Sequence, residues 1–246
     1  ELRRRGFRFV ALADDNFYPV ALSDLAAAPR RQDHPRLHEP EALRRERFEL
    51  MSRLEQLPDD MVFFTQITME AAEDEEFLEA MRRAKIRGAL VGVESVTEEG
   101  LKDVYKGFNL AGEDLVQRLK QFRKHGIHIL GSFIFGLPSD RHDTFKTTLD
   151  LAERADLTFA QFVLLTPFPG TIDFEKWAKE QVDPMTVDGV PVTTHWLIDE
   201  SKRPKIFMPH PTMSSEEIRT RTQQVWDDFY SWGRIWQRST VVTSLK

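Results

Sequence analysis

Residues 7–17 read FRFVALADDNF, an apolar and β-prone run that ends abruptly in the acidic pair Asp14 and Asp15. Four further apolar runs end in polar residues and precede helical stretches: 61–67, 89–94, 127–135 and 159–165. The runs are continuously apolar rather than alternating, which is typical of parallel strands buried on both faces. Repeated strand and helix units of this kind predict an α/β fold with a parallel sheet or barrel.

Polar and small residues cluster at the predicted carboxyl ends of these strands. In parallel sheets and barrels, ligands bind at that edge, so these positions form a candidate site: Asp14, Asp15, Asn16, Glu94, Ser95, Gly136 and Thr166. Carboxylates there can accept hydrogen bonds from an ammonium group or from ribose hydroxyls. Gly131 and Gly136 flank an apolar segment and leave room for an adenine ring against the backbone.

The composition narrows the class of protein. With 246 residues, 41% of them hydrophobic and 30% charged, the chain is expected to be an ordinary globular protein with one main domain. Its net charge of −6 argues against a nucleic-acid groove. It holds no run of about 18 apolar residues, so we expect no membrane span. The absence of cysteine excludes disulfides and favours the cytoplasm.

Four motifs occur in an order that resembles the radical S-adenosylmethionine enzymes: ADDNF at 13–17, GVES at 92–95, FGLP at 135–138 and TPFPGT at 166–171. The sequence is most similar to the subfamily that carries an upstream cobalamin (B12)-binding domain. The resemblance implies a partial, TIM-like (β/α)6 barrel, of which residues 1–180 hold all but the first βα unit. Residues 181–246 are then a C-terminal extension with a long amphipathic, aromatic-rich helix.

The resemblance also implies which residues bind the cofactor. Asp14, Asp15 and Asn16 stand where the family contacts the amino group of the methionine moiety. Glu94 and Ser95 match the position that meets the ribose or carboxylate. The remaining matches are the fifth-strand adenine segment and the end of the sixth strand: Gly131, Phe135, Gly136, Thr166 and Pro167. No residue is assigned as an acid, a base or a radical relay.

One departure from the family concerns its iron–sulfur cluster. Three cysteines hold the 4Fe-4S cluster in the family, and this sequence contains none, nor does it begin with Met. We therefore expect a fragment that lacks the cluster-binding segment and is inactive alone. The intact protein is expected to cleave S-adenosylmethionine to a 5′-deoxyadenosyl radical, with methyl transfer favoured if cobalamin is used. Its implied partners are a small-molecule substrate, upstream segments of the same protein, and a reductant such as flavodoxin or ferredoxin.

Two alternatives remain open on the sequence. A degenerate barrel could act as a non-catalytic scaffold, and a barrel aldolase or isomerase could use a lysine or the Asp14 and Asp15 pair directly. None of the predicted strand ends carries a lysine. The histidine spacings match no compact ligand set, so we expect no metal site within these residues.

Several local features are also predicted. Gly88 is expected to end the helix before the third strand, and Asp140 is expected to cap the helix that follows the fourth. Asp188 and Gly189 predict a hairpin turn. Residues 214–217 predict a capped helix start, followed by apolar residues at helical spacing: Ile218, Val225, Phe229, Trp232 and Trp236.

Overall fold

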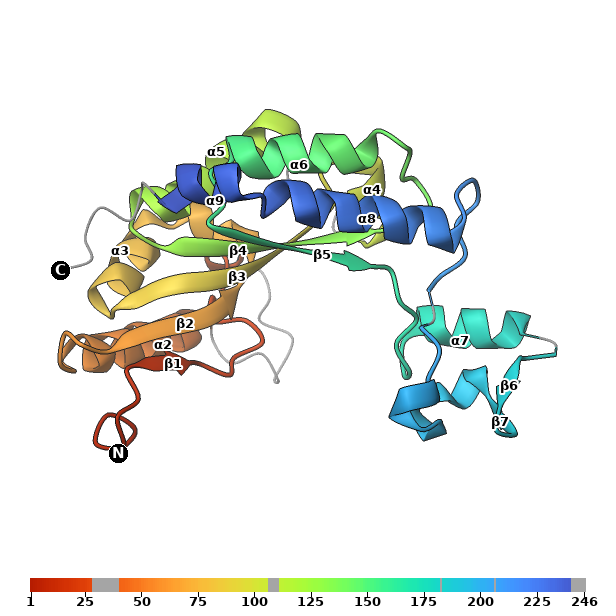
Figure 1. Ribbon diagram of the computed structural model, residues 1–246. Helices are drawn as coiled ribbons and strands as arrows, with labels where there is room; N and C mark the ends of the chain where they lie inside the picture. Colours follow the sequence, from red (N-terminus) through yellow and green to blue (C-terminus); the bar gives the residue numbers. More distant parts are fainter. Residues whose placement is uncertain (28–39, 106–110, 182, 206, 240–246) are drawn as a thin grey trace.

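The computed structural model describes residues 1–27, 40–105, 111–181, 183–205 and 207–239. Five strands form one curled parallel sheet in the order of the chain (Figure 1): β1 (Phe9–Ala11), β2 (Val62–Ile67), β3 (Ile86–Glu94), β4 (His128–Phe135) and β5 (Phe159–Leu164). Each strand pairs only with parallel neighbours within this sheet. The predicted α/β fold with five parallel strands adjacent in chain order is confirmed.

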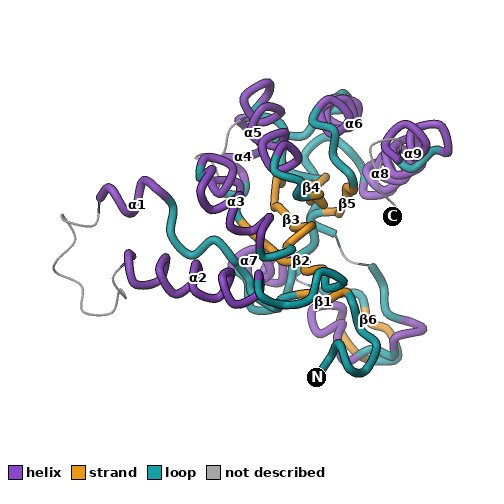
Figure 2. Tube along the Cα trace, turned by 90° about the vertical axis from the view of Figure 1, so that its left-hand side faces the viewer, coloured by secondary structure: helices purple, strands orange, loops and turns teal. Residues whose placement is uncertain are grey.

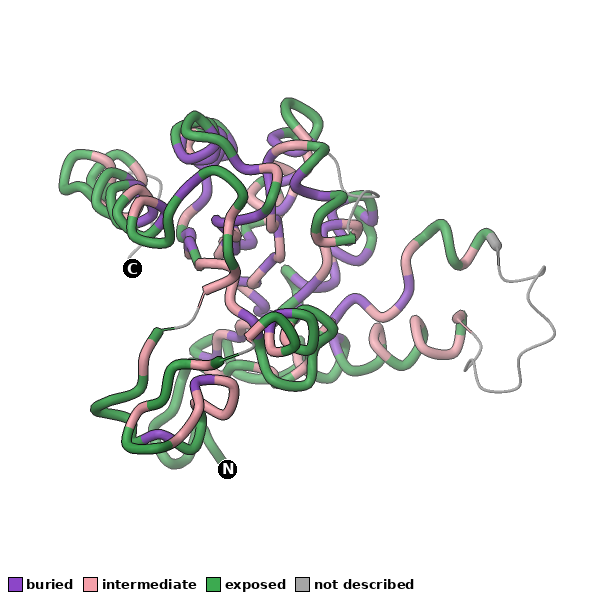
Figure 3. Tube along the Cα trace, turned by 90° about the vertical axis from the view of Figure 1, so that its right-hand side faces the viewer, coloured by how far each residue is buried: buried purple, intermediate pink, exposed green. Residues whose placement is uncertain are grey.

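Helices cover one face of the sheet (Figure 2), and they follow the strands in the chain: α2 (Pro40–Glu55), α3 (Glu75–Arg83), α5 (Gly112–Lys124) and α6 (Thr144–Arg154). Shorter helices lie in the connections: α1 (Leu22–Ala27), the 3-10 helix η2 (Met69–Glu73) and α4 (Glu98–Asp103). The helices pack on the sheet through apolar faces, and α3, for example, buries Phe77, Leu78 and Met81. The buried core therefore lies between the sheet and the helical layer, as Figure 3 shows.

The two faces of the sheet differ in burial. On the helix-covered face, Val91, Phe133 and Phe162 are almost fully buried. Side chains alternate along a strand, so the other positions point to the opposite face, which we call the inner face. There Phe9 is 60% exposed and Phe159 is 51% exposed. The expectation of strands buried on both faces is wrong for this inner face, because a continuous apolar run does not reveal which of its residues are covered.

A buried carboxylate joins three segments beneath the helical layer. Asp74 accepts hydrogen bonds from the hydroxyl of Tyr18 (3.1 Å), from the backbone N–H of Phe77 (3.0 Å) and from the guanidinium of Arg44. These bonds connect the loop after β1, the start of α3 and helix α2. The hydrogen bond to Asp74 raises the pKa of Arg44, and burial together with the Asp74 carboxylate raises the pKa of Tyr18. The network fixes the loop that leads away from Asp14 and Asp15.

Gly88 does not end a helix. Helix α3 ends at Arg83, and Lys85 reverses the chain with φ 63°. Gly88 lies inside β3, where a Cβ atom would be 2.8 Å from the ring of Phe64. A glycine is needed there because the Phe64 ring covers the strand, so the predicted helix end is wrong.

The chain after β5 forms a small structure beyond the end of that strand (Figure 1). It contains α7 (Ile172–Glu180), the hairpin strands β6 (Thr186–Val187) and β7 (Val190–Pro191), and the 3-10 helices η3 (Val192–Leu197) and η4 (Glu200–Lys202). The hairpin turn at Asp188 and Gly189 is confirmed, with φ of 50° and 81°. A domain boundary near residue 180 stays a prediction.

The last segment returns to the sheet as α8 (Ser215–Phe229) and then α9 (Trp232–Ser239). The predicted helix start is confirmed, since Ser214 Oγ accepts a hydrogen bond from the N–H of Glu217 (3.1 Å). Helix α8 packs on β5, where the indole of Trp226 donates to the carbonyl of Phe162 (2.9 Å).

The expectation of one long helix is wrong, because the chain breaks between Phe229 and Trp232. Trp232 and Trp236 are 88% and 74% exposed, whereas Val225 and Phe229 on α8 are buried in the core. No helix in the described part of the chain has the length and apolar character needed to cross a membrane.

Replacing Asp74 with alanine is expected to lower the free energy of unfolding by about 3 kcal/mol, because the change leaves the buried Tyr18 hydroxyl without its acceptor and the partly buried Arg44 with only the exposed Glu76 as a partner. The matched control is Glu76→Ala, which removes a mostly exposed partner of the same arginine and should cost less than about 1 kcal/mol. Urea denaturation followed by circular dichroism measures both. Equal effects of the two changes would contradict the role given to the buried network.

Candidate functional site

A pocket of about 410 Å³ opens on the inner face, near the carboxyl ends of the strands. We call it the rim pocket. Its lining comes from the loop after β1, from β2 and the start of η2, and from β3, β4 and β5: Asp15, Gln66, Ile67, Thr68, Met69, Glu70, Leu90, Gly92, Glu94, Ser132 and Gln161. The parallel arrangement predicted from the sequence therefore does gather polar side chains from several strands at one place.

Strand β3 contributes Leu90, Gly92 and Glu94 at alternating positions. The pairing with β4 shifts register between Gly92 and Glu94, and Glu94 has φ 66°. A non-glycine residue in this left-handed conformation costs about 1–3 kcal/mol of strain. The irregular backbone directs the last residue of β3 to the rim pocket, as bulges next to binding sites commonly do.

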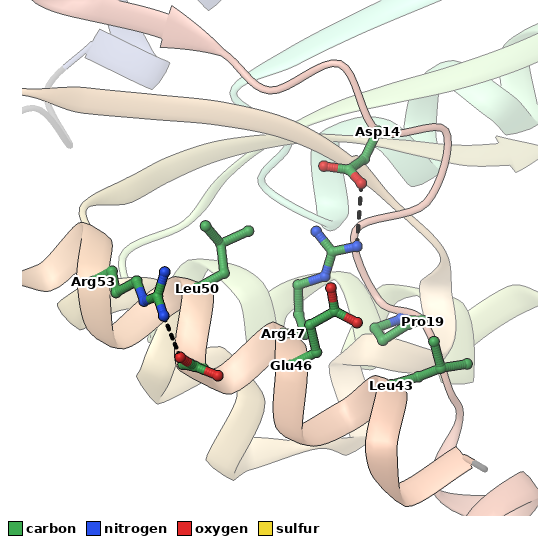
Figure 4. Close-up of a pocket in the computed structure, with 8 residues that line it drawn as sticks. Asp14, Pro19, Leu43, Glu46, Arg47, Leu50 and Arg53 are labelled. Carbon is green, nitrogen blue, oxygen red and sulfur yellow. Dashed lines mark hydrogen bonds and ion pairs between the residues drawn. The ribbon is translucent and has the colours of Figure 1, made fainter. Parts of the chain in front are cut away.

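The acidic pair after β1 divides between two places. Asp15 lines the rim pocket. Asp14 lines a second pocket, of about 530 Å³, and forms an ion pair with Arg47 of α2 (3.1 Å), as Figure 4 shows. Among the described residues, that second pocket is lined by α2 and the loop after β1, with none from β2 to β5. It therefore lacks the convergence of strand ends that marks the rim pocket.

Asn16 has a structural task in the same loop. Its Oδ1 accepts hydrogen bonds from the backbone N–H groups of Tyr18 (3.1 Å) and Thr68 (3.2 Å). The second bond ties the loop after β1 to the end of β2, on the wall of the rim pocket. Asn16 thus positions Asp15 without lining the pocket itself.

Ser95 lies under helix α4 rather than in the rim pocket. It is 4% exposed, and a Cβ atom on Gly100 would stand 2.1 Å from its Oγ. The neighbouring Thr97 caps α4 by accepting from the N–H of Gly100 (3.1 Å). Of the Glu94 and Ser95 pair, only Glu94 lines the rim pocket.

The β4 candidates face the helical layer. A Cβ atom on Gly131 would lie 2.7 Å from Leu157, and the buried ring of Phe135 packs against Phe145 at 4.4 Å between centroids. Close packing therefore accounts for this glycine. Contact of the β4 main chain with an adenine ring stays a prediction.

Ser132, which follows Gly131 on β4, faces the rim pocket. Gln161 of β5 donates from Nε2 to the Oγ of Ser132 at 2.9 Å. The pair leaves the Gln161 carbonyl and the Ser132 hydroxyl hydrogen available to a ligand in the pocket.

The buried carboxylate of Asp140 stabilises the turn at Gly136. Asp140 Oδ2 accepts from the N–H groups of Gly136 (2.8 Å) and Leu137 (3.0 Å), and Gly136 has φ 94°. The predicted cap on α6 is wrong: Asp143 precedes that helix, and its side chain makes no capping bond. Burial raises the pKa of Asp140 to about 6.

Thr166 and Pro167 form the exit from β5. The hydroxyl of Thr166 donates to the carbonyl of Leu164 (3.0 Å), and Pro167 is buried. Neither residue lines the rim pocket. Their contact with a cofactor stays a prediction.

Five polar residues of the rim pocket were missed by the sequence analysis: Gln66, Thr68, Glu70, Ser132 and Gln161. The sequence does contain a pattern that could have identified three of them, because Gln66, Ser132 and Gln161 are polar residues inside apolar strand runs. A polar residue at such a position points to the less covered face of the sheet, where it can meet a ligand.

The fold matches solved structures. The radical S-adenosylmethionine methyltransferase TsrM from Kitasatospora setae, solved with cobalamin and a [4Fe-4S] cluster bound, superposes with a TM-score of 0.60 at 19% identity, over 91% of this chain and 44% of that one. The cobalamin-dependent S-adenosylmethionine radical enzyme OxsB superposes with a TM-score of 0.58 at 15% identity, over 92% and 35%. The chain has the fold of the cobalamin-dependent radical S-adenosylmethionine enzymes. The resemblance drawn from its four motifs is confirmed.

Sequence relatives agree with this assignment. An uncharacterized methyltransferase of Pyrococcus horikoshii is 27% identical over 157 residues, which cover 64% of this chain and 32% of the relative. The bacteriochlorophyllide d C-12(1)-methyltransferase of Chlorobaculum tepidum is 34% identical over 137 residues, or 55% and 29%. The chain spans about a third or less of the length of these relatives. No family model matches the sequence.

The buried Asp140 predicts a pH-dependent stability. Its pKa in the folded protein, about 6, lies above its ordinary value, so its contribution is fully present below about pH 4 and is lost as the pH rises through 6. Between pH 4.5 and 7.5, the free energy of unfolding should fall by about 2 kcal/mol in the wild type relative to Asp140→Asn. Urea titrations at each pH measure this difference.

The control for the Asp140 experiment is Asp143→Asn, which removes an exposed carboxylate just before α6. The difference in free energy of unfolding between the wild type and this control should stay nearly constant between about pH 4.5 and 7.5. A wild type that gained stability over Asp140→Asn with rising pH would contradict the assignment.

Proposed function

We propose that this chain is the S-adenosylmethionine-binding part of a radical S-adenosylmethionine methyltransferase, with the cofactor in the rim pocket. One observation carries the proposal. Asp15 and Glu94, which the family motifs mark for the cofactor, line one pocket at the carboxyl ends of the strands. Nothing in the local sequence requires two residues so far apart to share a pocket; the parallel sheet brings them together.

The chemistry of the lining suits the polar parts of this cofactor. Carboxylates accept charge-assisted hydrogen bonds from an ammonium group and from ribose hydroxyls. Ser132 and Gln161 offer a donor and an acceptor to a ligand in the pocket. Gly92 lies on β3, between β2 and β4, and has no side chain to cover its backbone there. Bound S-adenosylmethionine supplies an electrophilic methyl group and, on reductive cleavage, a 5′-deoxyadenosyl radical. The residues of this chain bind the cofactor, orient it and exclude water.

The iron–sulfur cluster does not fit the residues of this chain. The 246 residues include no cysteine, so cysteine ligands to a cluster must come from beyond them. A 4Fe-4S cluster and cobalamin belong to the proposal for the whole protein, because TsrM holds both and OxsB is cobalamin-dependent.

For the whole protein we propose methyl transfer to a small-molecule substrate, with electrons from a reductant such as flavodoxin or ferredoxin. Most of the sequence relatives are named as methyltransferases, and one of them is a hopanoid C-2 methylase of Rhodopseudomonas palustris. An aldolase that forms a Schiff base gains no support, because the described lining of the rim pocket contains no lysine.

In the full-length protein, with its cluster assembled under anaerobic conditions, Asp15→Ala and Glu94→Ala should each weaken S-adenosylmethionine binding by about ten- to a hundredfold. Each change removes a hydrogen bond to a charged group, worth about 1.5–3 kcal/mol. Isothermal titration calorimetry measures the affinities. The isolated 246-residue chain should show no tight site for S-adenosylmethionine, because it contains no cysteine to hold the cluster.

The neighbouring Asp14 supplies a matched control. It lies on the same loop as Asp15, but its carboxylate pairs with Arg47. Asp14→Ala should therefore change the affinity by less than about threefold. If Asp14→Ala and Asp15→Ala weaken binding equally, or if neither Asp15→Ala nor Glu94→Ala weakens it, the cofactor does not occupy the rim pocket as proposed.

A further inference from the structure

The rim pocket carries negative charge on its wall. Three of its lining residues are carboxylates, namely Asp15, Glu70 and Glu94. The rest of the described lining is neutral, with no lysine, arginine or histidine among it. A partly enclosed pocket of one charge sign attracts ligands of the opposite sign, because low-dielectric walls concentrate its field.

Glu70 is the carboxylate that neither the motifs nor the fold explains. It is the second residue of η2, and its Oε2 is buried without a hydrogen-bond partner among the described residues. A carboxylate oxygen removed from water without a partner is costly, so such an atom in a native structure calls for a partner such as a water, an ion or a ligand. Glu73 in the same helix differs, because it forms an ion pair with Arg118 and lines a separate groove with α5.

The arrangement of the carboxylates favours an organic cation over a metal ion. Across the described residues, no three side chains of the metal-binding types come together closely enough to hold an ion. The acidic groups instead come from three different segments around a pocket of about 410 Å³, a volume typical of a small-molecule site. The ligand they suit is therefore an organic molecule with a positive charge inside the pocket.

We propose that Glu70 makes the rim pocket select the positively charged sulfonium of S-adenosylmethionine over the neutral thioether of S-adenosylhomocysteine. The inference rests on the function proposed above, and it assigns Glu70 as a specificity-determining residue. The attraction does not need direct contact, because Coulomb energies between charges a few ångströms apart remain significant in a partly buried site. The pocket then holds the reactive cofactor and releases the product that has lost its charge.

The test compares the two ligands in the full-length protein with its cluster assembled. They differ by one methyl group and by the charge on sulfur, so the ratio of their dissociation constants isolates that difference. In Glu70→Gln, which keeps the size of the side chain, the preference for S-adenosylmethionine should fall by about three- to tenfold. Glu70→Asp, which keeps the charge, should retain most of it.

Glu73→Gln is the matched control, because it removes a carboxylate from the same helix outside the rim pocket. In this variant, the ratio of the dissociation constants of the two ligands should equal the wild-type ratio. A ratio unchanged in Glu70→Gln, or both ligands weakened equally, would overturn the assignment of Glu70 while leaving the proposed function standing. Failure of the wild-type protein to bind S-adenosylmethionine would overturn the proposed function and, with it, this inference.

Discussion

Parallel pairing between neighbouring strands brings the carboxyl ends of β1 to β5 to one edge of the sheet. The helices that connect parallel strands cover one face, so the other face and this edge are left for ligands. Residues as far apart in the chain as Asp15 and Gln161 line the same pocket for that reason. The rim pocket follows from the topology before any side chain is considered.

Four carboxylates of this chain differ in whether the protein supplies their partners. Asp74 and Asp140 are buried and accept several hydrogen bonds from the protein, and Asp14 is paired with Arg47. These residues hold loops and turns in place around the pocket. Glu70 leaves a buried oxygen without a partner in the described structure, which is the pattern expected of a group reserved for a ligand.

Strain and packing restrict the site further. The left-handed backbone of Glu94 and the shifted register at the end of β3 are maintained by the pairing with β4. Gly131 is a glycine because Leu157 packs against the strand, and Gly136 turns the chain above Asp140. The helical layer therefore sets where the strand ends lie, and through them the shape of the pocket.

The sequence by itself determined the number, type and order of the strands, because apolar runs and turn residues act locally. It also determined the hairpin at Asp188 and the capped start of α8 at Ser214, where one side chain or one backbone conformation decides the structure. The order of its motifs led to the right fold.

Only the tertiary structure decided which residue of each adjacent pair lines the pocket. Side chains alternate between the two faces of a strand, so a shift of one residue separates a ligand contact from a packing contact. Asp15 and not Asp14, Glu94 and not Ser95, and Ser132 rather than Gly131 line the rim pocket. Glu70 joins them because η2 begins directly after the end of β2 and contacts β3. That choice depends on how the helices pack on the sheet and on the bulge in β3, and these are long-range interactions that no local pattern contains.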